Sequence, residues 1–167
     1  MQIKPVTAAA SLAFMAAFAS CLLYAKIHKE EKMNMKKAPI DTVFAQGDVN
    51  PYGKFFTGVT YLTLLSTNDE TFNAPIGNVT FEPGARTHWH KHAGGQILLV
   101  LNGEGRYQER GGRLRVLKKG DVVRIAPDAE HWHGAAPDSW FVHVSVETNA
   151  HKGPATWLEP VTDEQYQ

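Results

Sequence analysis

The chain has 167 residues, 43% of them hydrophobic, which suits a single domain with one proper core. Its formal net charge is zero, but residues 1–40 carry six lysines and two glutamates, whereas residues 41–167 carry eleven basic and fifteen acidic side chains. An acidic body without a basic stripe argues against nucleic-acid binding, so no nucleic-acid partner is expected.

The first expected element is the uncharged run PVTAAASLAFMAAFASCLLYA, 21 residues long at positions 5–25. A bilayer core needs ~20 apolar residues, so this run is an export or anchoring segment. Its basic start and the triplet Ala17-Phe18-Ala19 are typical of a signal peptide cleaved before Ser20. The stretch FASC also resembles a bacterial lipoprotein box, and an uncleaved helix is a third alternative, which the lysines beyond the run disfavour. We therefore expect an exported protein, periplasmic or attached to the membrane through residues 1–25.

Cys21 is the only cysteine and lies within this leader. The body of the protein can therefore form no internal disulfide and no thiolate metal site, and any metal must be held by histidine, carboxylate or amide. Residues 26–54 are polar and include KEEKMNMKK and GDVNPYGK, which is typical of a tether. The folded domain is expected at residues 55–167.

From residue 55 onward the sequence consists of short β-rich runs separated by Gly, Pro, Asn and Asp clusters. A spacing of about eight to twelve residues between such runs is typical of an all-β sandwich or barrel. Gly111-Gly112 stands between two runs and indicates a tight hairpin. The expected strands are 55–65, 78–83, 96–103, 105–110, 113–117, 121–127 and 140–147.

The stretch THWHKHAGGQ, residues 87–96, has histidines on every second position. Side chains two apart on a strand share a face and lie ~6.6 Å apart along it, because the rise is ~3.3 Å per residue. Zinc-type sites hold imidazole nitrogen at ~2.0–2.1 Å, so two such neighbours can converge on one ion and a third cannot easily join them. One histidine of this stretch is therefore expected to have another role.

A second cluster, EHWHGA, again has two histidines two residues apart, and the two clusters together resemble the cupin family. Its motifs are Gly-x5-His-x-His-x3,4-Glu-x6-Gly and Gly-x5-Pro-x-Gly-x2-His-x3-Asn. Ala126, Asp128 and Ala135 depart from the second motif. The resemblance covers roughly residues 75–147 and implies a double-stranded β-helix, the cupin jelly-roll barrel. The motif spacing, anchored on Gly84, Gly103 and Gly120, implies that the metal ligands are His90, His92, Gln96 and His131.

A narrower resemblance begins near residue 77 and reaches the C-terminus. Gln96 in place of the motif glutamate, the phrases TFEPGART and HWHGAAP, and the tail VTDEQY are similar to small manganese-containing cupins that act as (R)-selective hydroxynitrile lyases. The hydrophobic leader departs from the pattern of those lyases. The resemblance implies one divalent metal ion, manganese first, while the donor types leave iron, cobalt, nickel and zinc open.

Gln96 has a chemical consequence of its own. Three neutral imidazoles and one neutral amide leave the charge of a divalent ion uncompensated, so the ion is expected to be a strong Lewis acid. The alternative for Gln96 is an amide that supports the ligands without touching the ion.

Two histidines are expected to take part in the chemistry: His133 as the acid/base and His143, on the last strand, as its alternate. For the polar face that includes His143, Ser145 and Glu147, a hydrogen-bonded structural network is the alternative. For the apolar wall residues, the alternative is core packing. The pocket residues expected from the sequence are Phe81, Thr87, His88, Leu98, Trp132 and Glu147, with His88 at the rim or on the surface.

Three functions are open at this stage. The first is a metal-dependent lyase that splits a cyanohydrin into an aldehyde and cyanide, the second is a cupin dioxygenase or other oxidoreductase, and the third is a periplasmic metal or small-ligand binding module without turnover. A small-molecule partner is common to all three. The resemblance also implies a dimer or tetramer. The apolar alternate face of residues 97–101 can pack against a second sheet, and the interior of the monomer is the alternative burial site for it.

Overall fold

The computed structural model describes Ser20, Leu23 and residues 37–167. The leader expected at residues 5–25, apart from Ser20 and Leu23, and the first part of the expected tether lie outside the described residues. No helix within the described part of the chain is long and apolar enough to cross a membrane. The compact unit that contains the barrel begins at Lys37.

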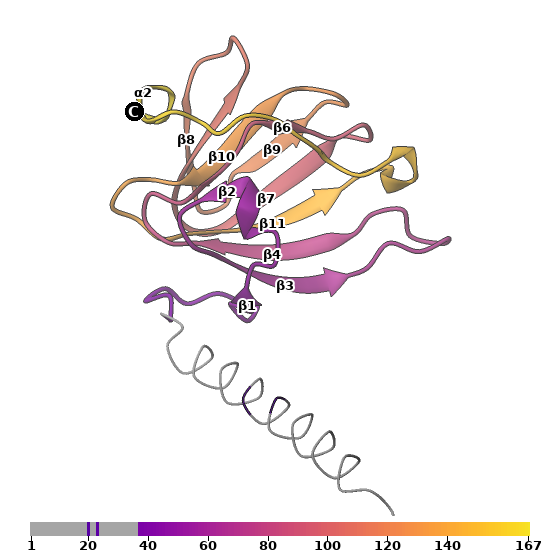
Figure 1. The fold of residues 1–167 in the computed structure, drawn as a ribbon, viewed down its shortest axis with the longest axis horizontal. Helices are drawn as coiled ribbons and strands as arrows, with labels where there is room; N and C mark the ends of the chain where they lie inside the picture. The colour runs from indigo at the N-terminus through magenta and orange to yellow at the C-terminus, as the bar shows by residue number, and fades with distance from the viewer. Residues whose placement is uncertain (1–19, 21–22, 24–36) are drawn as a thin grey trace, which may run out of the picture. The chain divides into compact units, whose positions relative to one another are not determined.

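This unit is built almost entirely of β-strands, which confirms the all-β barrel class (Figure 1). A single short helix, α2 (Asp163–Tyr166), and two 3-10 turns, η1 (Gly53–Phe55) and η2 (Ala150–Lys152), accompany them. The strands are β1 (Asp48–Val49), β2 (Phe56–Thr57), β3 (Thr60–Ser66), β4 (Ile76–Phe81), β5 (Arg86–Thr87), β6 (His90–Lys91), β7 (Gln96–Glu109), β8 (Arg115–Lys118), β9 (Val122–Ile125), β10 (His131–Ala135), β11 (Phe141–Glu147) and β12 (Thr156–Trp157).

The strands form one strongly curled antiparallel sheet in the order β1-β3-β4-β11-β7-β10-β5-β2. The long strand β7 joins the two halves of the barrel. Its first part pairs with β9 and β11, and its second part pairs with β8 and β10. The change falls at Gly103, whose φ is +77° and whose added Cβ would lie 1.8 Å from the carbonyl oxygen of Trp140. Only glycine fits this crowded bend, which explains the glycine that ends the first motif.

Two apolar clusters hold the barrel together. The inner one fills the space between the sheet halves with Val79, Phe81, Ala85, Leu98, Val100, Tyr107, Leu117, Val123, Ile125, Ala135 and Phe141. The outer one joins Trp89 and Trp132 to Val161 and Tyr166 of the C-terminal segment. Burial of each large apolar side chain contributes about 1.5–3 kcal/mol relative to exposure. The C-terminal segment therefore forms part of the fold, and it crosses one side of the barrel in Figure 1.

Residues 37–54 pack on the barrel and are not a free tether. The side-chain amide of Asn78 donates to the carbonyl oxygen of Ala45 at 2.9 Å, and that of Asn102 donates to Asp41 at 2.8 Å. β1 then pairs with β3. Polar composition suggested a linker here, but amides on the outer faces of the strands bind the backbone of this segment. The folded unit thus begins before residue 55, and a tether stays a prediction for residues 26–36.

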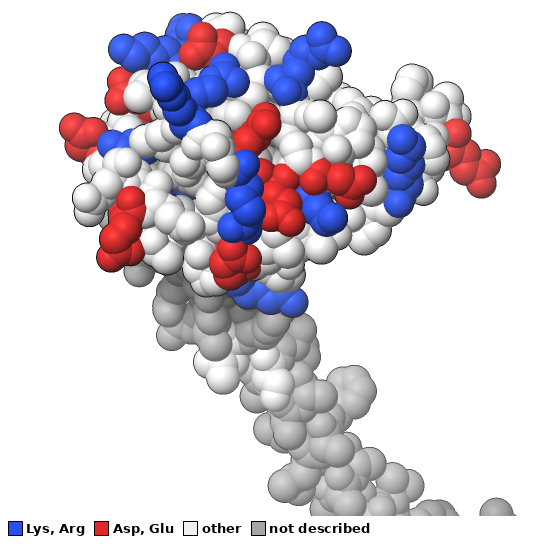
Figure 2. Space-filling model, turned by 90° about the horizontal axis from the view of Figure 1, so that it is seen from above, with Lys and Arg blue, Asp and Glu red and all other residues white. Residues whose placement is uncertain are grey.

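Charged side chains of both signs are interspersed over the face shown in Figure 2. Arg110 pairs with Glu159 at 2.6 Å, and Lys118 lies 3.8 Å from Glu104. On β7, Leu99 is 37% exposed and Ile97 is half-buried, so part of the apolar face proposed for self-association is accessible. Self-association and the lack of a nucleic-acid partner both stay predictions.

Candidate metal centre and catalytic pocket

Three histidines meet inside the barrel with one potential ligand nitrogen each. The ligand atoms of His90, His92 and His131 all lie within 4.8 Å of one another, and the three side chains are buried. His90 and His131 are brought together because β6 and β10 pair at these two residues. His92 follows two positions after His90, as strand alternation requires for a shared face.

The outer nitrogens of two of these rings are fixed by the backbone. Nδ1 of His90 lies 3.0 Å from the carbonyl oxygen of His88, and Nδ1 of His131 lies 2.9 Å from that of Ala129. A carbonyl oxygen can only accept a hydrogen bond, so both rings carry their proton on Nδ1. The Nε2 atom of each ring is then unprotonated and faces the cluster. Metal-binding histidines are usually held in this way.

Gln96 completes the cluster with its amide oxygen. Its Nε2 donates to Oγ of Ser145 at 2.8 Å, and its Oε1 lies 3.0 Å from Nε2 of His131. With the His131 proton on Nδ1, two atoms that carry lone pairs face each other at this distance. A cation between them removes the repulsion, so the arrangement fits a metal ion bound by three imidazoles and one amide oxygen.

Burial keeps the candidate ligands neutral. It lowers the pKa of His92 and of His131 to about 4 and lowers the pKa of His90 well below its ordinary value of 6.5. Nearby histidines lower the pKa of His90 and His92 further. Nε2 of His92 is buried without a hydrogen-bond partner in the described part of the chain. Neutral imidazole is the form that binds metal, so this set can hold a divalent ion near pH 7.

The loop before His131 keeps the backbone shape of the second motif despite its changed residues. Asp128 stands where the motif has glycine and adopts φ +61°, a left-handed conformation that Asp tolerates better than most side chains. Its backbone N–H donates to the carbonyl oxygen of His92 at 2.9 Å. The turn therefore ties the two ligand segments together.

A second histidine pair lies beside the cluster. Nε2 of His143 on β11 lies 3.2 Å from Nδ1 of His133 on β10. Nε2 of His133 and Nδ1 of His143 are buried without a hydrogen-bond partner among residues 37–167. Burial lowers the pKa of His143 to about 4 and that of His133 well below its ordinary value. The pair is neutral at pH 7 and can accept a proton.

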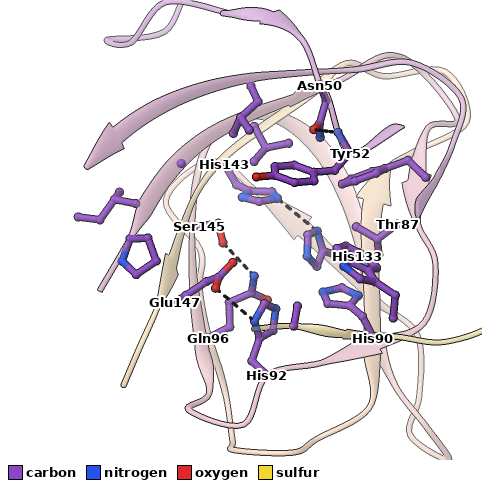
Figure 3. Close-up of a pocket in the computed structure, with 18 of the residues that line it drawn as sticks. Asn50, Tyr52, Thr87, His90, His92, Gln96, His133, His143, Ser145 and Glu147 are labelled. Carbon is purple, nitrogen blue, oxygen red and sulfur yellow. Dashed lines mark hydrogen bonds and ion pairs between the residues drawn. The ribbon is translucent and has the colours of Figure 1, made fainter. Parts of the chain in front are cut away.

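Both histidine groups open into one cavity of about 360 Å³ (Figure 3). Its volume lies within the range that is usual for small-molecule sites. Burial raises the pKa of Glu147, whose carboxylate lies in the cavity near His92. The lining comprises Asn50, Tyr52, Phe56, Leu62, Leu64, Pro75, Ile76, Gly77, Val79, Phe81, Thr87, His90, His92, Gln96, His133, His143, Ser145, Glu147, Pro154, Ala155 and Trp157.

Three of the pocket residues expected from the sequence line this cavity and three lie elsewhere. Phe81, Thr87 and Glu147 belong to the lining. Leu98 is buried in the inner core, and His88 is half-buried and contributes its carbonyl oxygen to His90. Trp132 alternates with the histidines of β10, so it points out of the barrel into the outer cluster.

Trp157 is a wall residue that sequence reasoning missed. Its ring stacks on His90 with centroids 4.7 Å apart and on Phe55 with centroids 4.7 Å apart and planes at 3°. β12 pairs with β6 so that Trp157 lies opposite His90. No local sequence motif predicts this long-range pairing. Tyr52 was missed for the same reason, because it lines the cavity from the segment that was expected to be a tether.

The fold and the histidine cluster define an all-β barrel with a metal-type site, and comparison with known proteins gives its family. The Cupin_2 family, described as a cupin domain, matches residues 77–146. The chain is 41% identical over 112 residues to an (R)-mandelonitrile lyase of Granulicella tundricola, which covers 67% of this chain and 86% of the relative. The chain belongs to the cupin family, as its two motifs predicted.

Two solved structures agree with this assignment. A cupin-like protein of Thermotoga maritima is 54% identical, covers 75% of this chain and 95% of its own, and superposes with a TM-score of 0.72. A cupin 2 conserved barrel domain protein of Rhodopseudomonas palustris is 18% identical, covers 75% of this chain and 76% of its own, and gives a TM-score of 0.53. The second likeness concerns the fold alone.

Proposed function

We propose that this protein is a metal-dependent lyase that cleaves cyanohydrins to an aldehyde and hydrogen cyanide, with manganese as the ion. One observation carries the proposal: a buried histidine pair, in which each ring has one nitrogen without a hydrogen-bond partner among residues 37–167, opens into the same cavity as the candidate ligand cluster. The 41% identity to a protein named (R)-mandelonitrile lyase supports the reaction class.

The ligand set has a defined part in this proposal. His90, His92, His131 and the amide oxygen of Gln96 would hold the ion. A divalent ion bound there would supply Lewis acidity that lowers the pKa of a substrate hydroxyl. Ser145 accepts from the Gln96 amide and so keeps the amide oxygen turned toward the histidines.

His133 is the proposed base. When Nδ1–H of His133 donates to Nε2 of His143, Nε2 of His133 carries the lone pair that accepts the hydroxyl proton. The O–H electrons form the carbonyl double bond while the bond to the nitrile carbon breaks, and that pair leaves with cyanide. His133 then returns the proton to cyanide, which leaves as HCN. Its low pKa favours this second transfer.

The cavity walls favour a substrate with an aromatic group. Phe56, Phe81 and Trp157 line it beside the polar residues, and the rings of Phe56 and Phe81 are tilted with centroids 6.1 Å apart. Aromatic rings prefer such tilted or offset neighbours. An aryl group would therefore lie against these rings with the cyanohydrin carbon toward the histidines.

The test is cleavage of mandelonitrile by purified full-length protein, with metal content measured on the same sample. We expect benzaldehyde and cyanide in equal amounts, at equal rates with and without dioxygen, and loss of activity after chelation that Mn²⁺ restores. A His151→Ala variant, altered at an exposed histidine outside the cavity, serves as the control. Dioxygen consumption or no cleavage by metal-loaded protein would contradict the proposal.

A further inference from the structure

The three candidate ligand histidines are not supported in the same way. His90 and His131 direct their outer nitrogens to backbone carbonyls, which no side-chain substitution removes. For His92 the structure provides a side chain: Nδ1 lies 3.8 Å from Oε2 of Glu147. The Glu147 carboxylate thus faces the outer nitrogen of His92, at a distance longer than an ordinary hydrogen bond.

Glu147 also lies next to the position where the cupin motif has its own carboxylate. Gln96 occupies that motif position, and Glu147 on β11 is the direct register partner of Gln96 on β7. Figure 3 shows the two side chains on the same side of the cavity, with Glu147 directed to His92 and Gln96 to Ser145. A carboxylate therefore stands on the strand next to the motif position, and an amide stands at the motif position itself.

We propose that Glu147 is a positioning residue for His92. We also propose that its carboxylate provides a negative charge next to the metal ligands, where the neutral amide of Gln96 provides none. This inference rests on the metal site of the proposed function. A carboxylate that accepts from the outer nitrogen of a ligand histidine fixes its tautomer and raises its basicity. The negative charge of Glu147 stabilises a bound cation from outside the ligand set. No ligand carboxylate neutralises the ion directly, so the ion keeps its affinity for a substrate oxygen.

The experiment measures Mn²⁺ affinity of metal-stripped full-length protein by titration against a competing chelator. Glu147→Gln removes the charge and keeps the shape, and Glu147→Asp keeps the charge on a shorter stem. Gln96→Glu combined with Glu147→Gln moves the charge to the motif position. Glu104→Gln is the matched control, because it removes a carboxylate of β7 that pairs with Lys118 on the surface. Urea unfolding of each metal-free variant verifies its fold.

We expect Glu147→Gln to weaken Mn²⁺ binding by about 10- to 100-fold, the usual effect of losing such a partner. Glu147→Asp should recover part of this loss, the double variant most of it, and Glu104→Gln should match wild type. The visible spectrum of bound Co²⁺ should also change in Glu147→Gln, because His92 is no longer held in place.

Wild-type affinity in Glu147→Gln, or a double variant that stays as weak as Glu147→Gln, would overturn the inference and leave the proposed function intact. A wild-type protein that binds neither Mn²⁺ nor Co²⁺ would overturn both.

Discussion

Nε2 of His143 lies 3.2 Å from Nδ1 of His133, although the two histidines come from different strands. A register irregularity between Val142 and His143 in the pairing of β11 with β7 adjusts the position of the His143 ring. Irregularities of this kind are common next to active sites, where they re-aim a side chain. The two rings are therefore within hydrogen-bond distance of each other, and the ring centroid of His133 lies 5.3 Å from that of His90.

The first prediction concerns this pair. His133→Ala should keep the metal and lower kcat by about 10²–10⁴-fold, which is the usual contribution of a positioned acid/base. His143→Ala should lower kcat less, because His133 keeps its lone pair and loses only its orientation. Steady-state kinetics on mandelonitrile at matched metal content gives the comparison. Undiminished kcat in His133→Ala would remove this residue from the chemistry.

The second prediction concerns ligation. His92→Ala and His131→Ala should each abolish most metal binding, because each deletes one of four donors. His88→Ala should bind metal as wild type does, since the backbone carbonyl that holds His90 survives the change. Metal content by elemental analysis after dialysis separates the two results. Stoichiometric metal in both ligand variants would refute the assigned site.

The third prediction concerns Gln96. Gln96→Glu should tighten metal binding and lower kcat, because a ligand carboxylate neutralises one positive unit and weakens Lewis acidity. Ser145 can adapt, since its hydroxyl can donate to the new carboxylate where it now accepts from the amide. Chelator competition and kinetics on the same preparation measure both effects. A rise in kcat would show that the missing charge does not limit the reaction.

Local strand geometry explains which parts of the site were predictable. The resemblance to the cupin motif selected His90, His92 and Gln96, strand alternation accounts for the shared face of His90 and His92, and the structure brings all three near His131. The same alternation should have excluded Trp132, which is out of phase with its histidine neighbours. Trp157 was beyond reach, because its place depends on the pairing of β12 with β6.

At two other places, polar residues are part of the fold because they bind partners that are distant in the sequence. Residues 37–54 looked like a linker, but their backbone groups are bound by side-chain amides of distant strands. Arg86 is buried and pairs with Asp163 at 2.6 Å, while its guanidinium lies over the ring of Tyr166. Both partners come from segments whose return to the barrel no local pattern specifies.

The fourth prediction concerns the pH dependence of stability in the metal-free protein. Burial lowers the folded-state pKa of the five histidines inside the barrel, so below about pH 6.5 the unfolded chain binds protons that the folded chain does not. Each such histidine lowers the free energy of unfolding by about 1.4 kcal/mol per pH unit at most, down to its folded pKa. Glu147, with its raised pKa, acts in the opposite direction but is a single group. The histidines are His90, His92, His131, His133 and His143.

Urea unfolding in the presence of a chelator measures this effect. The midpoint should fall between pH 7.5 and pH 5, and His143→Phe should reduce the fall, because it removes one of the five titrating groups. His151→Ala should leave the fall unchanged. Equal midpoints at the two pH values would mean that the buried histidines do not resist protonation.

The last prediction concerns Trp157, which touches both the candidate metal centre and the substrate space. One face of its ring stacks on His90, and its ring also packs against Phe55 and Phe56 at the cavity wall. Trp157→Ala should therefore raise KM for mandelonitrile, because the aryl group loses a wall, while KM for a small aliphatic cyanohydrin changes little. Loss of the aromatic contacts should also lower the free energy of unfolding by about 0.5–1.5 kcal/mol per pair.

Trp157→Phe keeps a ring in place and should recover most of the loss in KM. Trp140→Ala is the matched control, since Trp140 is a half-buried tryptophan that packs on Tyr61 and does not belong to the cavity lining. A purely structural role would raise KM for both substrates alike or lower kcat alone. Either result would assign the aryl group to another wall of the cavity, with Phe81 as the next residue to change.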